Sequence, residues 1–314
     1  MFDLLPAELV EQIGLTLLSV AAVDVPYKNE VEVAVQRVRT LHPLVLVNTR
    51  FNAIFTPHLY RQLILQTLNS RTSFLDHTAK NREIRKLVKI LIYSESMNGS
   101  RFHNIASKSS DLDKVLLALP HITTLKISQV IYWKKWMAYQ SSDCIDLTSL
   151  THLRTLELLE PRSVQGLNIS LHSILPQIER LVVSGLELRP YESGARDLYA
   201  GLINLKSIRI HSTRFTFEMW TGAILSMIGS DKLEEIDLDS TIPFTMYLGP
   251  HPFMKVGTFD RWKETLRVFR FIGDPLEAEL RKYLHVALQD CEVVDITEIP
   301  VLHGEGHSLK LWMG

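Results

Sequence analysis

Residues that could do chemistry are few and scattered in this 314-residue chain. Cys144 and Cys291 lie far apart and have no adjacent histidine, which disfavours a zinc site or a catalytic thiol. His303 and His307 are four residues apart, but the glycines between them disfavour the helix that would bring both rings to one metal ion. No phosphate-binding glycine loop, G-x-S-x-G or H-E-x-x-H pattern occurs. The sequence therefore predicts no catalytic residue, no cofactor and no metal, and we expect a protein that is not an enzyme.

Charged residues do recur at one place in a pattern, between two apolar residues, at intervals of 25 to 33 residues. They are Lys126, Glu157, Arg209, Asp237, Arg270 and Asp295, with Val182 at the same place as an exception. Their signs alternate along the chain, so on neighbouring parallel strands they would form a ladder of opposite charges. Such a face could capture a protein partner, or it could simply be the solvated side of a sheet.

A repeated apolar template positions these charges. Its clearest copy is Leu119, Ile122, Leu125 and Ile127. Further copies are Leu150, Leu153, Leu156, Leu158; Leu175, Ile178, Leu181, Val183; Leu202, Leu205, Ile208, Ile210; and the weaker Ile84, Leu87, Ile90, Ile92 and Leu288, Cys291, Val294, Ile296, with two partial copies, Leu233, Ile236, Leu238 and Leu266, Phe269, Phe271. A recurring unit of this length is typical of a solenoid.

The segments before these strands have helical character, clearest at 110–119 and 276–288. Alternating helix and strand predicts an α/β leucine-rich-repeat solenoid, a horseshoe with parallel strands on the concave face and helices on the convex face. A doubly wound α/β domain also has parallel strands, but no glycine-rich strand-to-helix turn supports it.

Composition narrows the class of partner. Apolar residues make up 46% of the chain and charged residues 22%, as in an ordinary folded protein. The formal net charge of −1 argues against nucleic acid or an anionic membrane as the main partner. With few cysteines and no apolar run long enough for a membrane helix, we expect a cytoplasmic or nuclear protein.

The N-terminal segment has helical signals. Pro6 suits a first helical position, and Leu9, Ile13 and Leu17 recur at four-residue spacing. We expect a second helix over about 38–54 and a third short piece that begins at Pro57. A long link, about 19–40, would separate the first two helices.

The segment Leu4–Leu65 resembles an F-box. LLPAELVEQI is similar to the opening LPxEL…I of that family, and LVLVNTRFNAIFTPHLYRQL is similar to its second half. The link between the halves is longer than usual, and Asn48 stands where a cysteine is often found. With the repeats that follow, the chain resembles divergent F-box and leucine-rich-repeat proteins of fungi. The resemblance implies two domains, an F-box-like helical domain over 1–65 and an irregular leucine-rich-repeat domain over 66–314.

The resemblance also implies a function, that of a substrate-recognition adaptor in an SCF-type ubiquitin ligase. The helices would bind a Skp-type adaptor of the cullin-based ligase, and the repeats would bind a protein substrate. The residues expected to dock or to support docking are Leu5, Pro6, Leu9, Ile13, Val47, Phe51 and Ile54. Two alternatives stay open: a repeat scaffold with a helical cap and no ubiquitin role, and an enzyme whose site the sequence does not reveal.

Overall fold

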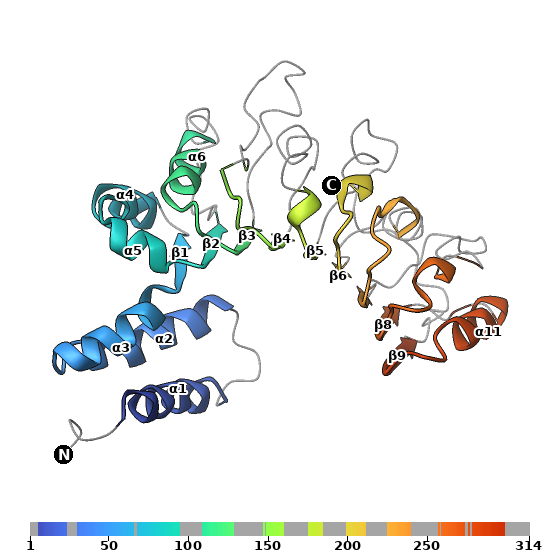
Figure 1. Cartoon of the computed structure of the whole chain (residues 1–314), viewed down its shortest axis with the longest axis horizontal. Coiled ribbons are helices and arrows are strands. Elements are labelled where there is room, and N and C mark those ends of the chain that lie inside the picture. Colours follow the sequence, from blue (N-terminus) through green and yellow to red (C-terminus); the bar gives the residue numbers. More distant parts are fainter. Residues whose placement is uncertain are drawn as a thin grey trace, which may run out of the picture.

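The structure is a computed structural model of the whole chain. It describes residues 6–23, 30–65, 68–94, 109–128, 147, 149–159, 175–184, 199–211, 225–239, 257, 259–273, 276 and 278–298. Two parts follow one another along this chain, a group of helices and a long curved sheet (Figure 1).

The helical part consists of α1 (Ala7–Val23), α2 (Glu30–Val45) and α3 (Thr49–Tyr60). The expected link over 19–40 is therefore wrong, because both helices extend into it and leave only 24–29 between them. The single helix expected over 38–54 is also wrong. Asn48 interrupts it, because its backbone is extended and its side-chain Oδ1 accepts a hydrogen bond from the Phe51 backbone N at 2.8 Å, which starts a new helix there.

Pro57 lies inside α3 and does not begin a third piece as the sequence suggested. Proline lacks the backbone N–H of a helix interior, so this arrangement costs one hydrogen bond. The helices share a small core of their own, made by Val10, Leu41, Phe51 and Phe55. Burial of these side chains offsets the cost.

The sheet has nine strands, all parallel and in chain order from β1 to β9. The strands are β1 (Gln62–Leu65), β2 (Ile90–Ser94), β3 (Thr124–Ser128), β4 (Thr155–Leu159), β5 (Arg180–Ser184), β6 (Ser207–His211), β7 (Glu235–Asp239), β8 (Val268–Gly273) and β9 (Val293–Glu298). They line the concave side of an arch (Figure 1). This is the solenoid-like α/β order that the repeats predict.

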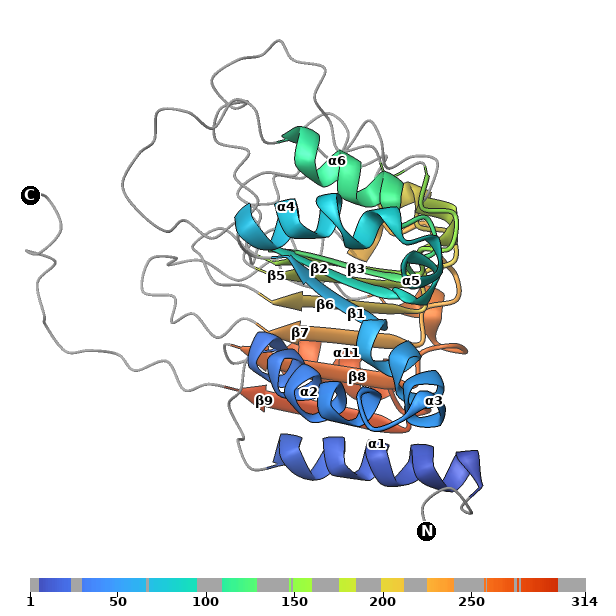
Figure 2. The ribbon, with the colours of Figure 1, turned by 90° about the vertical axis from the view of Figure 1, so that its left-hand side faces the viewer.

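Helical segments lie on the convex side, between the strands in sequence. They are α4 (Leu68–Asp76), η2 (Thr78–Lys80), α5 (Arg82–Leu87), α6 (Ser109–Ala118), η5 (Leu175–Gln177), η6 (Asp260–Trp262) and α11 (Ala278–Ala287). Figure 2 shows α4 and α6 against one side of the sheet, and Figure 1 shows the N-terminal helices at the end of the arch that begins with β1. The helices expected at 110–119 and 276–288 are confirmed as α6 and α11.

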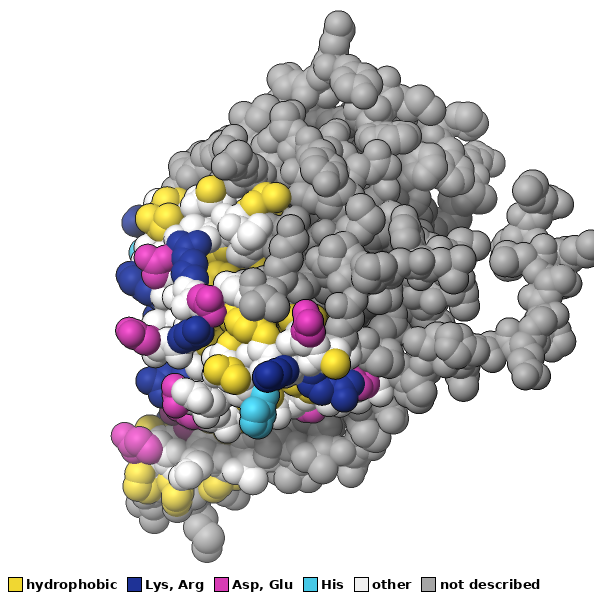
Figure 3. Space-filling model, turned by 90° about the vertical axis from the view of Figure 1, so that its right-hand side faces the viewer, with side chains coloured by type: hydrophobic (Ala, Val, Ile, Leu, Met, Phe, Trp, Pro, Cys, Tyr) yellow, Lys and Arg dark blue, Asp and Glu magenta, His cyan; other side chains and the backbone are white. Residues whose placement is uncertain are grey.

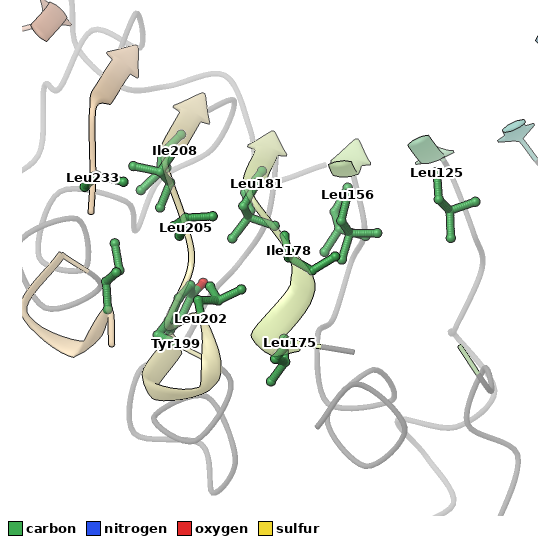
Figure 4. Close-up of a cluster of buried hydrophobic side chains, with 14 of the residues drawn as sticks. Leu125, Leu156, Leu175, Ile178, Leu181, Tyr199, Leu202, Leu205, Ile208 and Leu233 are labelled. Atoms are coloured by element: carbon green, nitrogen blue, oxygen red, sulfur yellow. The ribbon is translucent and has the colours of Figure 1, made fainter. Parts of the chain in front are cut away.

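The template positions form the core. Leu125, Leu156, Leu181 and Ile208 are partners in the parallel register, and each is at most 4% exposed. Figure 4 shows them in one row, with Ile178 and Leu205 before the strands of Leu181 and Ile208. The alternation of each strand turns one set of side chains into this core and the other set to the concave face. The predicted inward positions of these units are confirmed.

The predicted register is wrong by one residue in β2. Leu91 and Tyr93, and not Ile90 and Ile92, are the partners of Leu125 and Ile127, and both are fully buried. All four residues from Ile90 to Tyr93 are apolar, so hydrophobicity alone does not distinguish the two faces of this strand. A shift by one residue exchanges the faces, which places Ile92 on the concave side.

Candidate functional site

The charged residues predicted for the concave face lie in one row across the sheet. The parallel register pairs Lys126 with Glu157, Arg209 with Asp237, and Arg270 with Asp295, as the sequence predicts. Val182 separates the first pair from the second. The β1 end of the row is apolar, because Ile64 and Ile92 hold the same position there.

The first pair is largely shielded from solvent. Lys126 Nζ lies 2.9 Å from Glu157 Oε2, and the two side chains are 14% and 13% exposed. The cost of removing two charges from water offsets much of the attraction in such a pair, but loss of either partner leaves the other charge poorly solvated. This pair joins side chains of β3 and β4 in addition to the backbone pairing of the two strands.

The second pair is part of a larger cluster on β6 and β7. Arg209 Nε lies 2.7 Å from Asp237 Oδ2, and His211 Nε2 lies 3.8 Å from the other carboxylate oxygen. Burial alone would raise the pKa of Asp237, but the nearby His211 and the Arg209 charge outweigh burial and lower that pKa below its usual value. His211 Nδ1 also lies 3.9 Å from Asp239 Oδ2.

The predicted ion pair between Arg270 and Asp295, both of which the structure describes, does not form. Arg270 bonds diagonally to Glu235 at 3.0 Å, on the preceding strand, and makes no ion pair with Asp295 within the described residues. The hydrogen bond found for the Asp295 carboxylate comes from Thr297 Oγ1 at 3.3 Å, on its own strand. Five of the six charges are thus engaged with opposite charges, and Asp295 at the end of the row is not, in the part of the chain that the structure describes.

The residues predicted to bind an adaptor divide into two groups. Pro6, Leu9, Ile13 and Val47 are exposed, Leu9 and Ile13 each by 43% and Val47 by 59%. Phe51 is buried and Ile54 packs against the small helical core, so these two can only support a surface. Leu5 lies outside the described residues.

Gly14 allows one side of α1 to pack closely against α3. A Cβ at Gly14 would overlap the ring of Phe55, so α1 approaches α3 closely along the side that holds Val10 and Gly14. Leu9 and Ile13 then lie away from that contact. A hydrogen bond between His58 Nε2 and Glu11 Oε1, at 2.6 Å, joins the same two helices at their edge.

Sequence reasoning missed Leu46, the most exposed large apolar residue described, at 70%. It lies with Val47 in the turn between α2 and α3. Its sequence signal was hidden because Leu46 and Val47 were assigned to the interior of a continuous helix. Val38 and Leu15 are further exposed apolar residues of these helices.

The described residues hold no group of three or more His, Cys, Asp or Glu that could bind a metal ion. Of the helices in the described ranges, none has the length and hydropathy needed to cross a membrane. A scan against protein-family models and a search of curated proteins found no match to this chain.

Proposed function

We propose that this protein is a non-catalytic adaptor of an SCF-type ubiquitin ligase. Its N-terminal helices bind a Skp-type adaptor in the manner of an F-box, and its leucine-rich-repeat horseshoe holds a protein substrate. Ubiquitin transfer, performed by other subunits of the cullin-based ligase, then becomes a matter of proximity.

One observation carries this proposal: the helical part leaves Leu9, Ile13, Leu46 and Val47 exposed although it has its own core. A helical cap of a solenoid is expected to have a polar outer face. Exposed leucine and valine side chains on a small helical unit instead fit a surface that a partner covers. The F-box resemblance of Leu4–Leu65 names the class of partner.

The test is co-expression with a Skp-type adaptor, followed by size-exclusion chromatography. The wild-type chain should co-elute with the adaptor in a one-to-one complex, and Leu46→Asp should abolish that complex, because a charge at an interface core cannot be buried unpaired. Leu117→Asp is the matched control, since Leu117 is a similarly exposed leucine on α6, at 65%. It should co-elute like wild type.

Two results would contradict the proposal. If the wild-type chain elutes alone and folded, the helices are a cap and the alternative of a scaffold without a ubiquitin role stands. If Leu117→Asp and Leu46→Asp weaken the complex equally, the binding surface does not lie on the N-terminal helices.

A further inference from the structure

The last strand of the sheet, β9, differs from the inner strands in its side-chain packing, its backbone pairing and its charge. The first difference is in packing, because Val294 is 46% exposed whereas its neighbour in register, Phe269, is fully buried. Val293 is 42% exposed as well. Figure 3 shows this end of the molecule, where hydrophobic side chains are visible among acidic and basic ones.

The second difference is in the backbone. β9 pairs with β8, and no strand among the described residues pairs with its other edge. Such an edge offers a row of N–H and C=O groups that another extended chain can use. Its outer groups are satisfied either by water or by an added strand.

The third difference is in charge. The two acidic residues at the ends of β9 have basic partners, since Glu292 pairs with Arg267 and Glu298 with Arg281, each at 2.6 Å. Asp295, between them, makes no ion pair within the described residues because Arg270 is bonded to Glu235. The alternation of charge along the concave row therefore stops at an acidic residue with its open side toward the free edge.

We propose that the free edge of β9 binds an extended segment of a partner protein that carries a lysine or arginine between two apolar residues. The basic side chain would lie beside Asp295 and continue the alternation of charge. The apolar side chains on either side of it would cover Val294 and Ile296, because alternate residues of an added strand point to the same face as their neighbours. Backbone hydrogen bonds supply the remaining affinity, as in other cases of strand addition.

A second copy of this chain is a poor occupant. Pairing of two β9 strands would bring the Asp295 carboxylates of both copies, neither of which has an ion pair among the described residues, into one interface. Like charges on neighbouring strands are destabilising. The chemistry of the edge thus favours a basic partner strand, whether or not the N-terminal helices bind an adaptor.

The test uses the full chain and two short synthetic peptides with blocked ends. Both have alternating threonine and valine, and one carries lysine and the other glutamate between two valines. The lysine peptide should bind about fivefold more tightly than the glutamate peptide, in fluorescence polarisation with a labelled peptide. Amide hydrogen exchange should slow in residues 293–298 when the lysine peptide is added.

Charge reversal makes the test specific. Asp295→Lys should invert the preference, so that the glutamate peptide binds more tightly. Because Asp295 is exposed, this change should leave the fold intact. Asp290→Lys, at an exposed acidic residue before the strand, is the control and should keep the lysine preference.

Three results would overturn the proposal. Equal affinity for both peptides would mean that Asp295 does not select the partner, and no binding with unchanged exchange would mean that the charged edge merely prevents association. The sequence itself contains an apolar–lysine–apolar segment, Leu309-Lys310-Leu311. Binding that appears only in the Lys310→Glu variant would identify the chain itself as the occupant.

Discussion

The helical part and the sheet treat their apolar side chains differently. In the sheet, the inward positions from β2 to β8 are at most 4% exposed. In the helical part, four buried residues make the core, while Leu9 and Ile13 are each 43% exposed and Leu46 is 70% exposed. Burial of apolar area is the main source of stability, so the apolar residues of the sheet contribute to folding. The helical part keeps some of them outside, where only a partner could bury them.

Charged residues show the reverse. On the concave face most charges pair with one another across strands, as Lys126 does with Glu157. The concave face, which has the more regular pattern of charged residues, therefore satisfies most of these charges within the sheet. Asp295 is the one residue of the charged row that makes no ion pair among the described residues.

The largest effect should come from the core of the sheet. Leu156→Ala should lower the free energy of unfolding by about 2–5 kcal/mol, because it removes a buried leucine side chain and leaves a cavity. Ile13→Ala, in the exposed stripe of α1, should cost less than about 1 kcal/mol. Denaturant melts of both variants measure the difference. Similar losses for the two would break the contrast between the sheet and the helices.

A smaller effect is expected at the contact of α1 with α3. Gly14→Ala should destabilise the helical part by about 1–3 kcal/mol, because its methyl group would overlap the Phe55 ring. A double-mutant cycle with Phe55→Leu should show coupling, since the smaller side chain relieves the overlap. Additive losses would mean that the two residues do not meet as described.

The Arg209–Asp237 pair predicts a dependence on pH. The lowered pKa of Asp237 means that its charged form is stabilised in the folded state, so its contribution is present above the ordinary pKa of about 3.9 and is lost as pH falls through the lowered value. Asp237→Asn should therefore be less stable than wild type by about 1–3 kcal/mol near pH 7, and the gap should close as the pH falls below the ordinary pKa and through the lowered one.

The matched control is Asp290→Asn, which changes an exposed carboxylate. It should shift the free energy of unfolding by no more than about 0.5 kcal/mol at either pH. Urea melts across the pH range measure both variants. A gap for Asp237→Asn that is independent of pH would show that packing, and not charge, holds this cluster together.

Much of the sheet could be predicted because its pattern repeats. Leu125, Leu156, Leu181 and Ile208 each follow the same spacing, and a repeated spacing is hard to satisfy with another fold. The prediction failed in β2, where Ile90 to Tyr93 are apolar on both faces and period-two alternation has no contrast. It failed in the helices because one hydrogen bond, which the Asn48 side chain accepts from the Phe51 backbone N–H, outweighed a continuous apolar period.

The candidate surfaces could be predicted only in part. Alternating charge indicated the ladder, but the diagonal bond of Arg270 to Glu235 depends on side-chain conformations that no sequence pattern specifies. The stripe of Leu9 and Ile13 was visible in sequence, but a stripe of apolar residues usually faces a core. The contact between Gly14 and Phe55, which are distant in sequence, turned that stripe outward.

The smallest effect on stability should come from that stripe, and it is the sharpest test of the contrast. Replacing both Leu9 and Ile13 by glutamine should change the free energy of unfolding by no more than about 1 kcal/mol, because both sites are largely exposed and glutamine is a good helix former. Binding of a fluorescent hydrophobic dye should nevertheless fall. The same substitution at Leu117 and Ile203, which are exposed residues outside the helical part, should reduce dye binding less, since these two residues belong to separate units. If both pairs of substitutions lower dye binding equally, the exposed residues of α1 are no more than scattered surface side chains, and the helical part has no special apolar face to offer.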